Sequence, residues 1–214
     1  MTPVATRANP VDKHEQRRRA LADSALRTLG ELGYAKASLR EIANNSEFSH
    51  GVVHYYFADK FELIIYCVKQ YKATCVTRYD GAVAESTTAD ELLATFADKL
   101  CETIVAEAPM HRLWYDLRSQ SMFEANLQDA VEQIDRTLEE MIWRIVSRYA
   151  ELAGAEPALP PHTAYGAVDG LFQQALLGYL TGRQDESLDV LRTEIRQLLP
   201  LLLRRPAAAA TDEA

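Results

Sequence analysis

The segment from Ser38 to Lys60 constrains this chain most, because helix-start signals recur in it at very short intervals. Ser38 and Glu41 have the spacing of a capping box, which predicts a helix that begins at Leu39. The polar run at residues 44–47 favours a turn, because these side chains compete with the backbone for hydrogen bonds. The pattern predicts a short helix followed by a tight turn.

A second helix is predicted from His50 to Tyr56, with Ser49 as its cap. Val53 and Phe57 follow each other at i, i+4 spacing and form one side of it. This leaves three residues of the helix for the opposite side: His50, His54 and Tyr55.

A third helix should start near Lys60, since Asp59 and Glu62 repeat the capping-box spacing before an apolar run. Lys60 then lies in the first turn of that helix. An ammonium group beside free backbone amides is suited to hold a phosphate.

These residues resemble the DNA-binding segment of the tetracycline-repressor (TetR) family of bacterial regulators, which reads I-A-x-x-A-G-V-S-x-G-x-x-Y-x-Y/H-F-x-x-K-x-x-L. The matching positions are Ile42, Ala43, Ser49, Gly51, Tyr56, Phe57, Lys60 and Leu63. Three positions depart from the pattern: Glu47 stands for a turn glycine, Phe48 for valine and His54 for tyrosine. Glu47 would be strained if the turn required a positive φ.

The resemblance implies double-stranded operator DNA as a partner. It assigns Tyr56 and Lys60 to phosphates, and His50, Val52 and Tyr55 to base edges or thymine methyl groups. The full set of expected DNA-binding residues is Ser38, Arg40, Ser49, His50, Gly51, Val52, His54, Tyr55, Tyr56 and Lys60.

His50 and His54 also have a spacing found in zinc sites, which suggests a zinc-dependent hydrolase as an alternative. The zincin pattern needs a glutamate after the first histidine, and Gly51 occupies that position. The cysteines form no C-x-x-C pair, and the chain has neither G-x-S-x-G nor H-E-x-x-H. We therefore expect no catalytic residues, no metal site and no cofactor. A plain helical protein-interaction module is the other alternative.

Composition fits a regulator without identifying one. The chain has 214 residues and three irregularly spaced cysteines, which indicates reduced thiols and a cytoplasmic protein. No apolar run suggests a membrane span, and the N-terminus does not resemble a signal peptide. Residues 1–60 contain nine Lys and Arg against seven Asp and Glu, a net charge of +2, whereas the remainder carries −10. The basic excess lies at the N-terminus, and the arginines at residues 17–19 and Arg40 provide phosphate affinity there.

The rest of the sequence predicts helices throughout, hence an all-α fold: an N-terminal three-helix helix-turn-helix head and a C-terminal helical ligand-binding and dimerisation domain. A helix at residues 20–32 should end near Gly33, and a long one should run from Lys60 to the Ser-Thr-Thr cluster at residues 86–88. Thr88 and Glu91 cap the next helix, which ends near Glu107 because of Pro109, and another helix spans about 124–152. The expected domains are a flexible basic arm (1–14), the DNA-binding domain (15–60), the effector and dimerisation domain (61–205) and a disordered tail (206–214).

Two final helices, at residues 163–180 and 188–203, are predicted to hold a homodimer together. Small residues in the first permit close helix approach, and the second has a wide apolar stripe formed by Leu191, Ile195, Leu198, Leu199 and Leu202. The resemblance implies that these helices pair with their symmetry mates, although such a stripe also fits a core within one chain.

The resemblance also implies a small-molecule effector that binds between the head and these last helices. Such sites are mostly apolar with a few orienting polar groups. The candidate pocket residues are Trp114, Tyr115, Arg118, Met122, Met141, Trp143 and Phe172, each of which also fits an ordinary core position. The hypothesis is a repressor that the effector releases from a palindromic operator.

Overall fold

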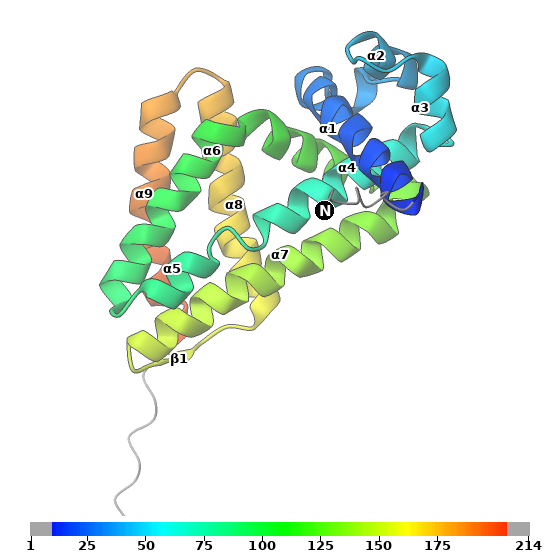
Figure 1. Cartoon of the computed structure of the whole chain (residues 1–214). Coiled ribbons are helices and arrows are strands. Elements are labelled where there is room, and N and C mark those ends of the chain that lie inside the picture. Colours follow the sequence, from blue (N-terminus) through cyan, green and yellow to red (C-terminus); the bar gives the residue numbers. More distant parts are fainter. Residues whose placement is uncertain (1–9, 205–214) are drawn as a thin grey trace, which may run out of the picture. The chain divides into compact units, whose positions relative to one another are not determined.

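A computed structural model describes residues 10–204 of the chain, and helices dominate it (Figure 1). This confirms the predicted all-α class. The helices are α1 (Pro10–Lys36), α2 (Leu39–Asn44), α3 (His50–Tyr56), α4 (Lys60–Cys75), α5 (Asp80–Glu85), α6 (Ala89–Gln120), α7 (Ala125–Leu152), α8 (Pro161–Leu180) and α9 (Gln184–Leu201).

The described residues form two compact units. Unit 1 comprises the residues up to 71 together with 112–130, and unit 2 comprises 72–111 together with the residues from 131 onward. Helices α4, α6 and α7 each contribute residues to both units. The functional division at residue 60 stays a prediction, and the predicted tail lies outside the described residues.

Helix α1 begins at Pro10, so residues 10–14 of the predicted flexible arm are helical; the rest of that arm lies outside the described residues. Proline is favoured in the first turn of a helix, which explains this earlier start. Gly33 interrupts the helical backbone with φ 76° and ψ 170°, at the position where the sequence predicted the helix to end. Leu21, Ala25 and Leu29 are buried in unit 1 as expected.

The long helix predicted from Lys60 to residue 86 is wrong in its length, because it is divided into α4 and α5. Two hydrogen bonds occupy carbonyls at the end of α4: Arg144 donates to Val76 O at 2.6 Å, and Thr77 Oγ1 donates to Thr74 O at 3.1 Å. A tertiary contact from α7 and a local threonine contact therefore both stabilise the end of α4.

Helix α6 starts as predicted, since Thr88 Oγ1 accepts a hydrogen bond from the Glu91 amide at 3.2 Å. Its backbone is kinked at Glu107, with φ −138° and ψ 25°, as Pro109 predicted. Helix α6 continues beyond the kink to Gln120, so the residues from Pro109 to Gln120 are helical as well.

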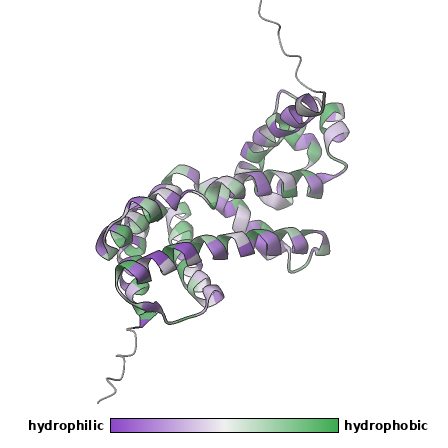
Figure 2. Cartoon of the chain, turned by 60° about the horizontal axis from the view of Figure 1, so that its bottom comes forward, coloured by the Kyte–Doolittle hydropathy of each residue, from purple (hydrophilic) through white to green (hydrophobic). Residues whose placement is uncertain are grey.

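Helices α8 and α9 pack closely against each other in unit 2. A Cβ atom added to Gly178 would lie 2.1 Å from Ser187 Oγ, so this glycine permits the close approach. The amphipathic character of the helices is visible in Figure 2, where most of them carry both hydrophilic and hydrophobic residues.

The predicted apolar stripe of α9 is largely internal. Leu191, Ile195, Leu199 and Leu202 are buried within the chain, which corrects its assignment to a dimer interface. Helix α9 is also tied to α6, since Arg192 Nε donates to Asp98 Oδ1 at 2.6 Å. These four residues belong to the core of their own chain, which was the alternative interpretation of the stripe.

One short antiparallel ladder was not predicted. Strand β1 (Glu156–Pro157) pairs with β2 (Leu203–Arg204), with Glu156 opposite Arg204. These two residues also form an ion pair at 3.3 Å.

Candidate functional site

The first helix of the candidate DNA-binding pair is capped as predicted. Ser38 Oγ accepts a hydrogen bond from the Glu41 amide at 3.1 Å, and α2 follows. Ile42 and Ala43 are buried, which fixes the inner face of α2, and Arg40 is exposed on its outer face. The capping serine therefore has a structural role in addition to its predicted place in the interface.

The turn between α2 and α3 accommodates Glu47 without the strain that the missing glycine suggested. Among the described residues, only glycines have a positive φ, so Glu47 has an ordinary backbone conformation. Ser46 supports the turn, because its hydroxyl oxygen accepts a hydrogen bond from the Phe48 amide at 3.2 Å. The departure from the family pattern at Glu47 is compatible with the fold.

Helix α3 begins after Ser49, whose side chain accepts a hydrogen bond from the Val52 amide at 3.4 Å. Val53 and Phe57 are fully buried, as their spacing predicted. The opposite side is open to solvent: His50, Gly51 and His54 are exposed, and the Tyr55 side chain is 74% exposed. Val52 and Tyr56 are half-buried. A short helix that buries one face and presents histidine and tyrosine on the other can enter a DNA groove.

A residue that the sequence reasoning missed lies beside this face. The His14 ring of α1 lies 4.8 Å from the Tyr56 ring and 6.0 Å from the Tyr55 ring, measured between centroids. Tyr55 and Tyr56 are themselves 5.0 Å apart with nearly perpendicular rings. His14 gave no sequence signal, because its neighbours in this cluster are some forty residues away along the chain.

Lys60 stands at the start of α4, as predicted, but its ammonium group is engaged within unit 1. Its Nζ donates a hydrogen bond to the Tyr34 carbonyl and lies 4.2 Å from the centroid of the Tyr34 ring. Burial lowers the pKa of Lys60, while the charges of Asp116 and Glu124 act in the opposite direction. The phosphate role of Lys60 stays a prediction and would use its remaining N–H donors.

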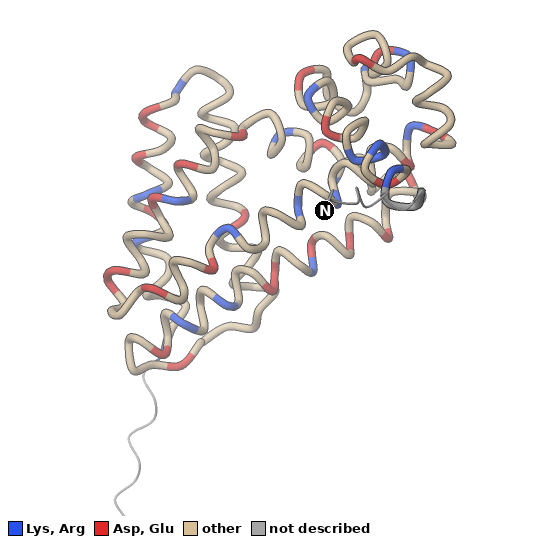
Figure 3. The backbone as a smooth tube through the Cα atoms, viewed as in Figure 1, with Lys and Arg blue, Asp and Glu red and all other residues tan. Residues whose placement is uncertain are grey.

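The three arginines at residues 17–19 differ in their surroundings. Arg18 pairs with Glu62 and lies over the rings of Phe57 and Tyr66, at 4.8 and 4.5 Å from their centroids. Arg19 pairs with Glu15 at 3.3 Å. Arg17 is exposed. Figure 3 shows Lys and Arg positions in blue along the backbone of α1.

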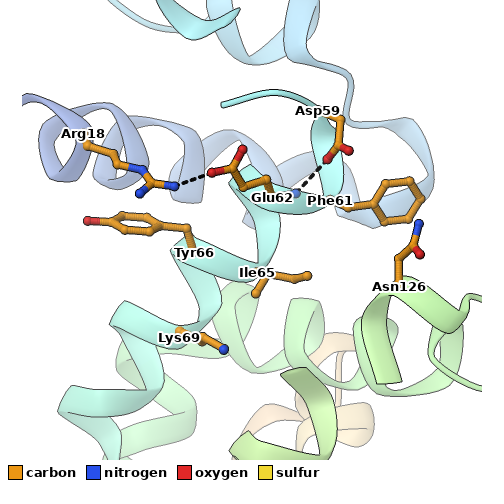
Figure 4. A pocket seen from close by; sticks show the side chains of 8 residues that line it. All are labelled: Arg18, Asp59, Phe61, Glu62, Ile65, Tyr66, Lys69 and Asn126. Atoms are coloured by element: carbon orange, nitrogen blue, oxygen red, sulfur yellow. Dashed lines mark hydrogen bonds and ion pairs between the residues drawn. The ribbon is translucent and has the colours of Figure 1, made fainter. Parts of the chain in front are cut away.

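The Arg18–Glu62 pair borders a surface groove of about 450 Å³ (Figure 4). Glu62 is fixed on its other side, because its amide donates to Asp59 Oδ1 at 2.9 Å, the second predicted cap. The groove also includes Lys69, so its walls carry several charged groups. Phe61, Ile65 and Tyr66 line it as well, but the groove is open to solvent, whereas effector sites are mostly enclosed.

The zinc alternative rests on His50 and His54, whose ring centroids are 4.4 Å apart. Within residues 10–204, no group of three or more His, Cys, Asp or Glu side chains is placed to hold a metal ion. The pair therefore has no third protein ligand in the described part of the chain.

Unit 2 contains a group of polar side chains, several of them buried, contributed by four helices. Lys72 of α4 is only 4% exposed and His111 of α6 only 6% exposed. Burial lowers the pKa of Lys72 to about 8, although Asp169 and Asp135 oppose that shift. Burial also lowers the pKa of His111 well below its ordinary value, and the positive charges of Lys72 and Arg78 add to this effect. His111 is therefore neutral near pH 7.

Further contacts tie this polar group to α7 and α8. The Tyr165 hydroxyl donates to Asp135 Oδ1 at 2.6 Å, and the His111 ring lies 5.0 Å from the Phe172 ring. Buried polar groups are costly in a helical core, and several of them from different helices are typical of a ligand site. The sequence signal for Lys72 was available, since it falls on the apolar stripe between Val68 and Cys75 at helical spacing.

The predicted effector residues are divided between the units. Trp114, Tyr115, Arg118 and Met122 belong to unit 1, whereas Met141, Trp143 and Phe172 belong to unit 2. Trp114, Met141 and Phe172 are buried, Tyr115, Arg118 and Trp143 are half-buried, and Met122 is 71% exposed in the turn before α7. Their role in ligand binding stays a prediction.

Comparison with known proteins decides the family. Residues 21–67 match the sequence model described as "Bacterial regulatory proteins, tetR family". The HTH-type transcriptional regulator BetI of Burkholderia thailandensis is 30% identical over 161 residues, which cover 73% of this chain and 76% of that protein. The chain belongs to the TetR family. It is thus a helix-turn-helix, DNA-binding transcriptional regulator, as the resemblance of residues 38–63 implied.

Other TetR-family similarities extend over most of the chain. BetI of Cronobacter sakazakii is 27% identical over 200 residues, covering 92% of this chain and 96% of that protein. A transcriptional regulator from Saccharomonospora viridis, solved in complex with choline, superposes with a TM-score of 0.72 at 16% identity, covering 89% of this chain and all of that one. At this identity the likeness shows the shared fold. These relatives are regulators and not enzymes, and in the described residues no helix is long and apolar enough to cross a membrane.

Proposed function

We propose that this TetR-family protein is a homodimeric repressor that binds a palindromic operator and is released by a small molecule. The observation that supports DNA reading most directly is the two-sided character of α3. Its inner residue Val53 is fully buried, while His50, His54 and Tyr55 are exposed along the outer side. Two such helices in a dimer would occupy half-sites about one helical turn apart, roughly 34–36 Å.

The homodimer is supported by the outer surface of α8 and α9. Four large apolar side chains outside the buried stripe are exposed on these two helices: Leu177 and Leu180 on α8, and Val190 and Leu201 on α9. Gly166 and Gly170 of α8 are exposed and have open space above them, so another helix can approach closely. We expect this face to pair with the same face of a second subunit.

The dimer is tested by the molar mass in solution. Light scattering after size exclusion should give twice the 24.0 kDa chain mass. Leu177→Glu should shift the protein towards the monomer, whereas the control Val105→Glu, at an exposed apolar position on α6, should leave the mass unchanged. A wild-type protein that remains monomeric at micromolar concentration contradicts the dimer.

The effector is proposed to bind at the polar group around Lys72 and His111 in unit 2. The buried ammonium and neutral imidazole give the site specific hydrogen-bonding partners, which suits a compact polar ligand. The ligand shifts the protein between two states only as far as its affinities for those states differ. Choline, with which the Saccharomonospora regulator was solved, is a first compound to test. Because choline is a cation, its head group would have to lie beside Asp135 or Asp169 and away from the Lys72 ammonium.

The DNA-binding proposal is tested by selecting sequences from random duplex DNA with purified protein. The selected pool should contain two inverted half-sites at a fixed spacing of about one helical turn. The best duplex then serves in a band-shift titration with candidate compounds, and an effector should weaken the shift. A selected pool without inverted symmetry contradicts the palindromic operator, and no enrichment of any sequence contradicts specific DNA reading.

A further inference from the structure

Histidines are concentrated around the exposed side of α3. The chain has five histidines. His50 and His54 lie on α3, and His14 of α1 contacts Tyr56 in the last turn of α3. All three side chains are exposed. By contrast, His111 and His162 belong to unit 2.

The geometry brings these imidazoles onto the surface that faces DNA in the proposed function. The His50 and His54 rings stand one helical turn apart, with centroids separated by 4.4 Å. The His14 ring lies 4.8 Å from the ring of Tyr56, the residue assigned to a phosphate by resemblance. A ligand that approaches Tyr55 and Tyr56 therefore also approaches His14.

Protonation of these three histidines would change the net charge of the N-terminal segment considerably. Residues 1–60 have a net charge of only +2 with histidine neutral, so three protonated imidazoles would raise it to +5. Other charged groups on α1, α2, α4 and the turns are either paired or exposed. Glu15 accepts from Tyr66 and pairs with Arg19, Glu62 pairs with Arg18, and Asp59 accepts from the Glu62 amide. The other exposed charged side chains of these segments are Lys13, Arg17, Asp23, Arg27, Glu31, Lys36, Arg40, Glu41, Glu47 and Lys69.

We propose that operator binding is coupled to proton uptake by His14, His50 and His54, so that the protein binds DNA more tightly as the pH falls. This inference rests on the proposed DNA-binding function and adds a regulatory input to the same surface. It also assigns His14, which lies outside the helix-turn-helix motif, to the DNA interface.

The sign of the effect follows from linkage. Histidine is the side chain whose charge ordinarily changes between pH 5 and 8. A phosphate close to an imidazole favours its protonated form, so the DNA complex binds more protons than the free protein does. The added affinity is fully present at low pH and is lost as the pH rises. An imidazole that holds its proton one pH unit more tightly on DNA adds about tenfold to the affinity.

The experiment is a fluorescence-anisotropy titration of the full chain at constant ionic strength, from pH 5.5 to 8. The probe is the duplex selected from random DNA. For the wild type we expect the affinity to rise by up to about tenfold for each histidine that takes up a proton as the pH falls. The combined rise in log affinity from His50 and His54 should be smaller than twice that of one, because two positively charged rings with centroids 4.4 Å apart oppose each other. The triple variant His14→Gln, His50→Gln, His54→Gln should lose this dependence, and His14→Gln alone should reduce it.

The control is His162→Gln, because His162 is an exposed histidine on α8. This variant should follow the wild type at every pH, and circular dichroism should show that all variants remain helical. A wild-type affinity that does not change with pH, or a triple variant that keeps the wild-type pH dependence, overturns the proposal. Absence of DNA binding at every pH contradicts the proposed function itself and is distinguishable from both results.

Discussion

Lys60 and Tyr34 join the start of α4 to the end of α1 in unit 1. The Lys60 ammonium donates to the Tyr34 carbonyl and lies 4.2 Å from the centroid of its ring. The Tyr34 amide in turn donates to Asp116 Oδ2 at 2.8 Å. The corner that follows α1 is thus fixed on both sides, and a residue predicted to hold phosphate also has a structural role.

Replacing Lys60 with alanine should therefore have two effects. Loss of the hydrogen bond and the cation–π contact should lower the free energy of unfolding by about 1 kcal/mol. If Lys60 also holds a phosphate, binding to all DNA sequences should weaken alike, and the slope of log affinity against log salt should decrease by about 0.9. Urea unfolding and salt titrations measure the two effects separately.

Lys69→Ala is the matched control for Lys60, because Lys69 is an exposed lysine on the same helix. Its unfolding free energy should stay within about 0.5 kcal/mol of the wild type. An unchanged salt slope in Lys60→Ala would remove the phosphate role, and unchanged stability would contradict the contact with Tyr34.

Gly51 should be required for DNA binding and not for the stability of the fold. It lies in the first turn of α3, and a Cβ atom there would meet no atom within 4 Å. Gly51→Ala should raise the free energy of unfolding by about 0.5–1 kcal/mol, because alanine favours helix. The same change should weaken operator binding if the helix backbone approaches DNA closely. Thermal unfolding measures the stability, and anisotropy titrations measure the DNA affinity. A Gly51→Ala variant that is destabilised but binds DNA normally would show that Gly51 is needed for the fold and not for DNA binding.

The burial of Lys72 predicts a specific dependence of stability on pH. Its pKa falls from 10.5 to about 8 in the folded state. Between these values the unfolded chain binds the proton and the folded one does not, so the contribution of Lys72 to stability increases as the pH rises from 8 to 10.5. The total is at most about 3 kcal/mol.

Several other groups act in the opposite sense at alkaline pH, which sets the design of the measurement; Cys67 and Tyr79 are the most buried of them. Burial raises the pKa of the Cys67 thiol and raises the pKa of Tyr79 to about 12, so both favour unfolding at high pH. The informative quantity is the difference in unfolding free energy between the wild type and Lys72→Met. Between pH 8 and 10.5, the unfolding free energy of the wild type should increase relative to that of Lys72→Met. A difference that does not change with pH would show that Lys72 is not buried as described.

The contact between α8 and α9 at Gly178 should tolerate no side chain. Gly178→Ala places a methyl group against Ser187 and should cost about 1–3 kcal/mol of unfolding free energy. Gly170→Ala on the same helix meets no atom within 4 Å in the subunit and should leave the stability of the monomer unchanged or slightly higher. Equal destabilisation by both substitutions, measured in urea at low protein concentration, would contradict this packing.

Local signals predicted the head of the protein well. The serine caps of α2 and α3, the buried pair Val53 and Phe57, and the interruption of α1 at Gly33 all depend on residues a few positions apart. Such short-range chemistry is readable from sequence. The family membership follows from the same residues.

Long-range contacts determine what the sequence did not reveal. The division between α4 and α5 depends partly on Arg144 of α7, and the engagement of Lys60 depends on Tyr34. An apolar stripe such as that of α9 does not by itself state whether it faces its own chain or a second copy. The effector residues stay a prediction, because aromatic and methionine side chains give the same sequence pattern in a core and in a pocket.

The most direct test of the central claim compares Tyr55→Ala with Phe123→Ala in binding to the selected duplex. Both aromatic side chains are largely exposed in unit 1, Tyr55 on α3 and Phe123, at 83%, in the turn before α7. Neither substitution removes core packing, so both variants should keep the melting temperature of the wild type. If the outer side of α3 reads DNA, Tyr55→Ala should weaken operator binding by about tenfold or more, a loss of about 1.4 kcal/mol, while Phe123→Ala should bind as the wild type does. Wild-type affinity in Tyr55→Ala, or an equal loss in both variants, would contradict the assignment of α3 as the recognition helix.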